Sequence, residues 1–174
     1  MARRIAILRF CAFARTSLSF PTYVDICFMP WDNEHVMTVK ELLQHQFDDA
    51  GYQLDKVFDG VDESLDFKLT EKGMSPREIA AHLSECYTAV ITEAAGGKHS
   101  WGSFQPSTTE WPALLTDMKE LRSKATAAAL EKEGWESHAN AFISAHDYYH
   151  VGQLASIRLT RDADWDAYSI YSQG

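Results

Sequence analysis

The sequence has few of the features that mark secreted or membrane-spanning proteins. It contains only three cysteines, Cys11, Cys27 and Cys86, at irregular spacing and with no Cys-x-x-Cys pair. An odd, scattered set of this kind fits a reducing cytoplasm better than a disulfide scaffold. No run of about 18 apolar residues occurs, so no transmembrane helix is expected. These absences predict a cytoplasmic protein without a membrane partner.

Positive charge is also scarce. The 174 residues carry 16 Lys and Arg against 25 Asp and Glu, which gives a formal net charge of −9. A strongly acidic protein repels the phosphate backbone, so nucleic acid is not an expected partner. The apolar content of 45% is high enough for a hydrophobic core, which argues against global disorder.

The sequence lacks any alternation of apolar and polar residues long enough to build a sheet, and it contains no internal repeat. Apolar residues instead follow helical spacing in four segments. These run from Thr38 to Gly60, from Ser75 to the Gly96-Gly97 stop, from Thr108 or Thr109 to Gly134, and from Ser137 to about Thr160. We therefore predict an all-α four-helix bundle.

The two ends of the chain differ from this helical part. Residues 1–36 hold four arginines and no acid before Asp25, and Arg9 and Arg15 interrupt any signal-peptide core. We interpret residues 1–36 as an irregular extension outside the domain at 37–174, although an organellar transit peptide has a similar composition. The last fourteen residues form a short polar-aromatic tail that has room to fold back.

The segment H-D-Y-Y-H-V-G-Q places His146 and His150 four residues apart in the last predicted helix. Side chains at this spacing have Cβ atoms about 5–6 Å apart on one helix face. Two such imidazoles can reach one zinc ion at about 2.0–2.1 Å. They belong to a predicted buried stripe in which two isolated imidazoles would each need a partner. That stripe consists of Phe142, Ala145, His146, Tyr149, His150, Gln153, Leu154 and Ile157.

A third histidine lies on the second predicted helix. Ser75 and Glu78 have capping-box spacing, and from this start His82 falls on the apolar face. Three core-facing histidines on two helices match catalytic zinc sites, which have three protein ligands and an open position. Cys86, one turn beyond His82, is the only nearby candidate for a fourth ligand. We interpret it as a small core residue, because free cysteine is commonly buried.

Three neighbouring residues, Glu85, Tyr149 and Gln153, are candidates for catalytic or supporting roles. Glu85, one turn from His82, is a candidate general base or hydrogen-bond partner, and a solvated position is the alternative. Tyr149 is expected to face inward, either to line the pocket or only to pack. Gln153 is expected to hydrogen-bond a metal-binding side chain. Asp147 lies off the apolar stripe and is expected to be exposed.

Aromatic residues in the Gly96–Thr109 loop could cover such a site. Trp101 and Phe104 are the candidates, although loop aromatics often only pack on the end of a bundle. The remaining histidines are expected at the surface or in loops. They are His35, His45, His99 and His138.

Two segments resemble a known family. S-P-R-E-I-A-A-H-L-S-E, followed by H-D-Y-Y-H-V-G-Q-L, is similar to the DinB-like (DinB/YfiT-like) four-helix-bundle superfamily of metalloenzymes, over about residues 37–160. This superfamily includes bacillithiol- and mycothiol-dependent enzymes, and many members have no assigned activity. The resemblance implies a bundle that commonly dimerises. It also implies that His82, His146 and His150 bind a divalent metal, most often zinc or nickel.

The expected function is a metal-dependent small-molecule enzyme, a transferase or isomerase that uses a low-molecular-weight thiol and an electrophile. A metal-bound thiol loses its proton; a hydrolase-like use of metal-bound water stays open. The alternative is a non-catalytic metal-binding stress-response module. A di-iron carboxylate bundle would need inward glutamates in E-x-x-H spacing, and these stripes carry histidine and apolar residues instead.

Overall fold

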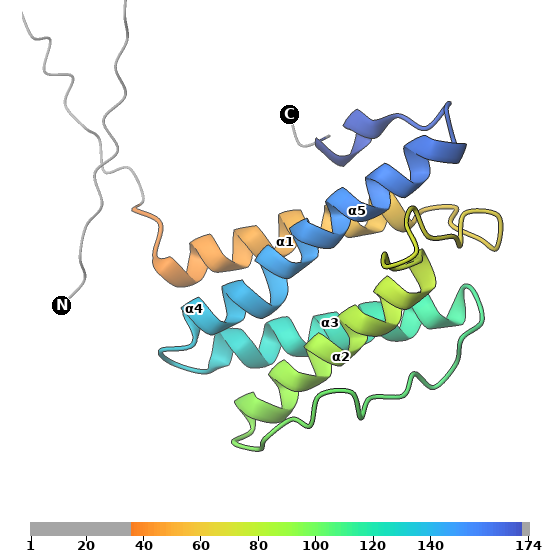
Figure 1. The fold of residues 1–174 in the computed structure, drawn as a ribbon. Helices are drawn as coiled ribbons and strands as arrows, with labels where there is room; N and C mark the ends of the chain where they lie inside the picture. The colour runs from red at the N-terminus through yellow and green to blue at the C-terminus, as the bar shows by residue number, and fades with distance from the viewer. Residues whose placement is uncertain (1–35, 172–174) are drawn as a thin grey trace, which may run out of the picture. The chain divides into compact units, whose positions relative to one another are not determined.

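The computed structural model describes residues 36–171, whose regular secondary structure consists of helices joined by loops (Figure 1). The first three long helices are α1 (Val39–Phe58), α2 (Pro76–Ala94) and α3 (Ala113–Glu131). The last rod joins α4 (Glu136–Ala139), the π-helical turn η1 (Asn140–Ser144) and α5 (Ala145–Arg161). A 3-10 helix, η2 (Ala167–Tyr171), follows. Within the described residues no strand occurs, which confirms the all-α prediction with four long helical segments.

The predictions for the chain ends have different outcomes. Residues 1–35 lie outside the described residues, so the interpretation of residues 1–36 as an extension stays a prediction. The C-terminal segment does fold back, because the Tyr52 hydroxyl on α1 donates to the Ser169 carbonyl of η2 at 3.3 Å. None of the described helices is both long enough and apolar enough to cross a membrane.

The first two long helices begin at the residues that the sequence predicts, because each start carries a capping box. Thr38 Oγ1 accepts from the Glu41 amide at 3.2 Å, and the Glu41 carboxylate accepts from the Thr38 amide at 2.7 Å. Ser75 and Glu78 repeat this reciprocal pair at the start of α2. These bonds satisfy amide groups that have no partner inside the helix.

The other two rods lack their predicted caps: Pro112 does precede α3 as expected, but neither Thr108, Thr109 nor Ser137 caps a helix. Helix α3 begins at Ala113, after Pro112, and has no side-chain cap; Thr108 Oγ1 accepts from Glu110 in the preceding loop. Helix α4 begins at Glu136 and also has no side-chain cap, so Ser137 lies inside the helix. In both helices the first amides have no side-chain acceptor, because the residue that was predicted to cap the helix does not accept from them.

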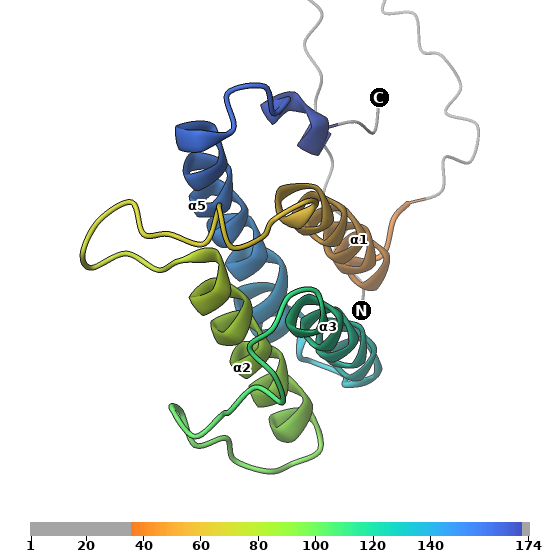
Figure 2. The same ribbon diagram turned by 90° about the vertical axis from the view of Figure 1, so that its right-hand side faces the viewer.

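Figure 2 shows the four rods at the corners of a square, with α5 next to α1 and α2, and α3 next to the same two helices. The core lies between them. Its largest fully buried members include Phe47, Leu54, Phe58, Ile79, Leu83, Tyr87, Leu114, Met118, Ile143, Leu154 and Ile157. Because α2 and α5 are neighbours, side chains on their facing edges can meet.

Candidate metal centre

The π turn η1 precedes the histidine pair and sets the orientation of α5. A π turn holds more residues than an α turn, so the side chains after it are rotated relative to those before it. The buried face of this rod consists of Ile143, Ser144, Asp147, His150, Val151, Leu154, Ile157 and Arg158. Compared with the predicted stripe, this face is shifted by about one residue along the sequence, so that Asp147 takes the buried position expected for His146. Two predictions were therefore wrong: Asp147 is completely buried, and Tyr149 is 62% exposed.

His82 of α2 meets His146 and His150 of α5. The His82 and His146 Nε2 atoms are 2.9 Å apart, and the ring centroids of the three histidines are 4.9–5.2 Å apart. One ring nitrogen from each histidine lies within 4.8 Å of the other two. His150 is buried, and the other two are half-buried. The three predicted residues thus come together in a group that could hold a metal ion.

His150 has one ring nitrogen in a hydrogen bond and one without a partner. Its Nδ1 lies 2.8 Å from Gln153 Oε1, and an amide oxygen only accepts, so the Nδ1 atom carries the proton. The Nε2 atom then has a free lone pair, and it is buried without a hydrogen-bond partner. Buried polar atoms rarely lack partners. A histidine held through one nitrogen while the other points to an ion is the common arrangement in metal sites.

The bond between His150 Nδ1 and Gln153 is the hydrogen bond that was predicted for Gln153. Gln153 in turn contacts Tyr149. Gln153 Nε2 donates to the Tyr149 hydroxyl at 3.0 Å. Tyr149 is therefore linked to the histidine group through the amide, although its ring faces outward. Because the Tyr149 oxygen accepts this bond, its own O–H remains available to donate.

Burial keeps the three imidazoles neutral. It lowers the pKa of His82, although the nearby Glu85 carboxylate acts in the opposite direction. Burial and the proximity of His82 lower the pKa of His146. Burial, and then the proximity of His146, lower the pKa of His150 to about 4. Neutral imidazole is the form that binds metals, so the group does not need to lose protons at neutral pH.

Cys86 adds a sulfur atom to the histidine group. It is 1% exposed, which confirms the prediction of a buried residue. Its Sγ atom also lies 3.8 Å from the Nε2 atoms of both His82 and His146. Burial, followed by the nearby carboxylates, raises the pKa of the Cys86 thiol to about 12. In the described structure it is therefore a neutral thiol.

The buried Asp147 belongs to a network that joins all four rods. Its Oδ2 accepts from Arg122 Nε of α3 at 2.9 Å, and its Oδ1 accepts from the Tyr87 hydroxyl of α2 at 2.6 Å. Arg122 Nη2 also donates to the Phe47 carbonyl of α1 at 2.6 Å. Burial raises the pKa of Asp147 to about 6, against the opposing effects of Arg122 and Tyr87. We call these residues the Asp147 network.

This network was not anticipated from the sequence. Asp147 directly follows His146, so its bonds to α2 and α3, with the further bond from Arg122 to α1, fix the rotation of α5 at the histidine pair. The Tyr87 and Arg122 side chains are positioning residues for the site. Their spacing along the chain carries no signal of this contact, because it depends on how the four rods pack.

Glu85 anchors the loop between α2 and α3. Its Oε1 accepts from the Gly102 amide at 2.6 Å and lies 3.3 Å from His99 Nε2. Burial acts to raise the pKa of Glu85, but the hydrogen bonds, chiefly from Gly102 and His99, have a larger opposite effect. The pKa is therefore lowered, and the group is a carboxylate. The His99 side chain is only 6% exposed. His99 therefore lies in a loop, as expected, but its side chain is buried rather than solvent-exposed.

The anchored loop brings an aromatic ring close to the helix that carries the site. Trp101 stacks on Phe142, with ring centroids 6.0 Å apart, and contacts His99 edge-on at 4.9 Å. Phe142 lies one turn before His146, and Trp101 is 51% exposed. Phe104 lines a different hollow of about 270 Å³ against α3. The loop thus places Trp101, not Phe104, beside the rod that carries His146.

The other histidines are dispersed over the bundle. His45 is exposed on α1, as predicted. His138 is half-buried, with its ring between Trp135 and Phe142 at centroid distances of 4.4 and 4.6 Å. His35 lies outside the described residues. None of these three belongs to the group formed by His82, His146 and His150.

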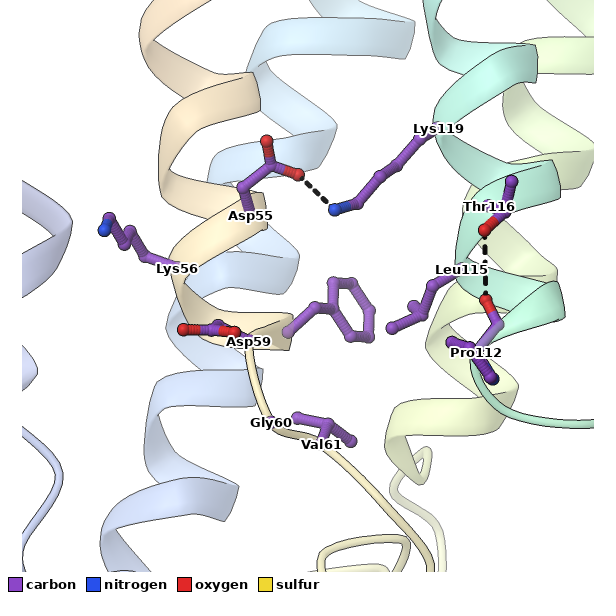
Figure 3. Close-up of a pocket in the computed structure, with 10 residues that line it drawn as sticks. Asp55, Lys56, Asp59, Gly60, Val61, Pro112, Leu115, Thr116 and Lys119 are labelled. Carbon is purple, nitrogen blue, oxygen red and sulfur yellow. Dashed lines mark hydrogen bonds and ion pairs between the residues drawn. The ribbon is translucent and has the colours of Figure 1, made fainter.

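A larger hollow of about 510 Å³ lies elsewhere, between the C-terminal end of α1 and the start of α3 (Figure 3). Asp55 and Lys119 form an ion pair across it at 2.8 Å. Its lining also includes Phe58, Asp59 and Leu115 and contains none of the three site histidines. This hollow is separate from the histidine group, which remains the candidate site.

Comparison with known proteins gives no match. No family model describes the sequence, and neither a curated protein nor a solved structure is significantly similar to it. The geometry of the histidine group therefore carries the functional argument.

Proposed function

We propose that this protein is a divalent-metal-dependent enzyme of the DinB-like superfamily, with His82, His146 and His150 as metal ligands. The observation that carries the proposal is the buried, unpartnered Nε2 atom of His150, whose opposite nitrogen is held by Gln153. A buried acceptor without a partner lowers the stability of the fold, unless a donor or a metal ion binds its lone pair. Water and protein groups do this in most buried sites; here three neutral ring nitrogens converge instead.

The donor set fits zinc or nickel. Imidazole ligands suit both ions, whereas magnesium and calcium prefer oxygen ligands. Two nitrogens on one tetrahedral zinc lie about 3.4 Å apart, given Zn–N distances of about 2.0–2.1 Å. The three ring nitrogens lie within 4.8 Å of one another, so small ring rotations bring them to this spacing.

The proposed reaction is the transfer of a low-molecular-weight thiol to an electrophile, or a thiol-dependent isomerisation. When bound, the metal ion would supply the positive charge that makes a thiol or water acidic near neutral pH. The neutral histidines would hold the ion, and Gln153 would keep the His150 ring in place. The Tyr149 hydroxyl would donate a hydrogen bond to the substrate. The exposed face of Trp101 would contact an apolar part of the substrate.

Glu85 has a positioning role in this proposal. Its carboxylate is used to hold Gly102 and His99, and through them the loop that carries Trp101. A Glu85→Gln variant can still accept a hydrogen bond from an amide but loses the charge. We therefore expect this variant to change the KM for the electrophile more than kcat.

Metal binding and turnover are tested separately. Zinc and nickel are titrated in turn into the metal-free chain, and bound metal is measured by elemental analysis. We expect one ion per wild-type chain and none in His150→Ala, while the exposed control His45→Ala binds like the wild type. Failure of the wild type to bind either ion would overturn the proposal.

Turnover is tested with a panel of thiols and electrophiles. We expect activity in the zinc- or nickel-loaded wild type and its loss in His146→Ala, with the His45→Ala control unaffected. One bound ion without any turnover would instead support the non-catalytic metal-binding module. A homodimer is part of the proposal, and light scattering of the purified protein measures the oligomeric state.

A further inference from the structure

The donors of the candidate site form two pairs with the same spacing. His82 and Cys86 are four residues apart on α2, as His146 and His150 are on α5. Residues at this spacing lie next to each other on one helix face. Because α2 and α5 are neighbours in the bundle (Figure 2), the two pairs lie on adjacent helices, and the Cys86 sulfur contacts the nitrogens of His82 and His146.

The distances from Cys86 Sγ to two of the three histidines are close to those of a four-ligand site, while the group whose donor atoms all lie within 4.8 Å of one another comprises the histidines alone. With a Zn–S distance of about 2.3 Å and Zn–N distances of about 2.0–2.1 Å, a tetrahedral site has S···N distances of about 3.6 Å and N···N distances of about 3.4 Å. Cys86 Sγ lies 3.8 Å from the Nε2 atoms of both His82 and His146. Those two nitrogens are 2.9 Å apart, so they need to separate by about half an ångström.

The buried state of the group supplies a second, independent observation. His150 is 2% exposed, and its Nε2 atom is completely buried without a hydrogen-bond partner. An ion bound between the two helices would give this nitrogen the partner that it lacks. A cysteine that only fills space in a core would need no such neighbour.

We propose that Cys86 is the fourth protein ligand, so that the site is a three-histidine, one-cysteine centre. This inference rests on the proposed function and deepens it. On metal binding the S–H bond of Cys86 breaks, the sulfur keeps the electron pair and bonds the ion, and the proton passes to solvent. No oxidant or reductant is needed.

A thiolate ligand has consequences for metal preference and for substrate access. It favours zinc, cobalt and nickel over magnesium and manganese, because sulfur is a soft ligand. Zinc can also expand from four to five ligands during a reaction. A Cys86 ligand therefore leaves room for a substrate thiol to reach the ion.

Cobalt(II) is the probe that separates nitrogen from sulfur ligation. It is titrated alone into three metal-free forms of the full chain: the wild type, Cys86→Ser, and the matched control Cys11→Ser/Cys27→Ser. We expect a near-ultraviolet thiolate-to-cobalt charge-transfer band in the wild type and in the control. In Cys86→Ser we expect the band to disappear while the visible d–d bands remain. Cobalt affinity should fall at least about tenfold, because even changes outside the ligand set cost about 10- to 100-fold.

The outcomes separate this inference from the proposed function. Visible cobalt bands without the charge-transfer band in the wild type would overturn the Cys86 ligand and leave the three-histidine site standing. No bound cobalt, zinc or nickel in the wild type would overturn both. If Cys86→Ser fails to fold, X-ray absorption on the zinc-loaded Cys11→Ser/Cys27→Ser control decides. It should show one sulfur at about 2.3 Å, and a shell of only nitrogen and oxygen would overturn the inference.

Discussion

Replacement of Asp147 by alanine is expected to be among the most destabilising single changes in the bundle. Asp147 is completely buried, and the Arg122 side chain that it pairs with is 14% exposed. Its removal leaves a buried guanidinium and the Tyr87 hydroxyl without their acceptor. Loss of one partner of a buried ion pair typically costs about 3–5 kcal/mol. We therefore expect Asp147→Ala to lower the free energy of unfolding by about this amount.

The matched control is an aspartate in an exposed pair. Asp55 lies 2.8 Å from Lys119, and these side chains are 58% and 49% exposed. Such pairs contribute about 0–1 kcal/mol, so Asp55→Ala should change little. Urea unfolding of the metal-free chains, followed by circular dichroism, measures both without a contribution from ligand binding. Equal losses in the two variants would refute the reasoning that the Asp147 network holds the four rods together.

Three further predictions concern single residues. Gln153→Ala should lower zinc affinity about 10- to 100-fold in calorimetric titration, because the ring that it orients becomes free to turn. An alanine Cβ at Gly51 would lie 2.5 Å from a guanidinium nitrogen of the Asp147 network, so Gly51→Ala should destabilise by about 1–3 kcal/mol in urea unfolding. The control Gly152→Ala, whose Cβ meets nothing within 4 Å, should not destabilise. Burial acts to raise the pKa of Asp66, but hydrogen bonds from Arg77 lower it more, so the ionised form stabilises the fold. The stability difference between Asp66→Asn and the wild type should then be present at pH 7 and shrink below about pH 4, the unfolded pKa; a constant difference across the pH series would contradict this.

The sequence predicted helix starts where a local side chain marks them. Thr38 and Ser75 accept from an amide three residues ahead, and a glutamate completes each box. Both partners lie within one turn, so a single sequence contains the information. Helices α3 and α4 begin without side-chain caps, so the caps predicted for them were wrong.

The π turn explains why the histidine pair was predicted correctly while its neighbours were not. His146 and His150 both follow the turn, so their spacing of four residues along α5 is unaffected. The assignment of Asp147 and Tyr149 depended on a stripe counted from Phe142, which lies inside the turn. A continuous α-helical count across this turn shifts the predicted face relative to the core. Asp147 and Tyr149, at the edges of that face, were therefore misplaced, whereas His150, Leu154 and Ile157 are buried as predicted.

Apart from the meeting of the three histidines, the contacts between distant parts of the chain that shape the site were not predicted from the sequence. Arg122 reaches Asp147 and the Phe47 carbonyl only after three helices have packed. Glu85 reaches Gly102 only because the loop after α2 folds back along the helix. In both cases the residue type permits several partners, and the tertiary arrangement selects one.

The two halves of the candidate site are held by different means. On the α5 side, the Asp147 network fixes the helix rotation, and Gln153 fixes the His150 ring. On the α2 side, the recorded contacts of the His82 ring among residues 36–171 are the His146 nitrogen, the Cys86 sulfur and the His150 ring, and none is a bond to a residue outside the group. Metal affinity depends on how little the ligands must be reorganised on binding. In the proposed site the α5 pair would therefore be the better preorganised half, and the ring of His82 would be the ligand that moves to complete the site.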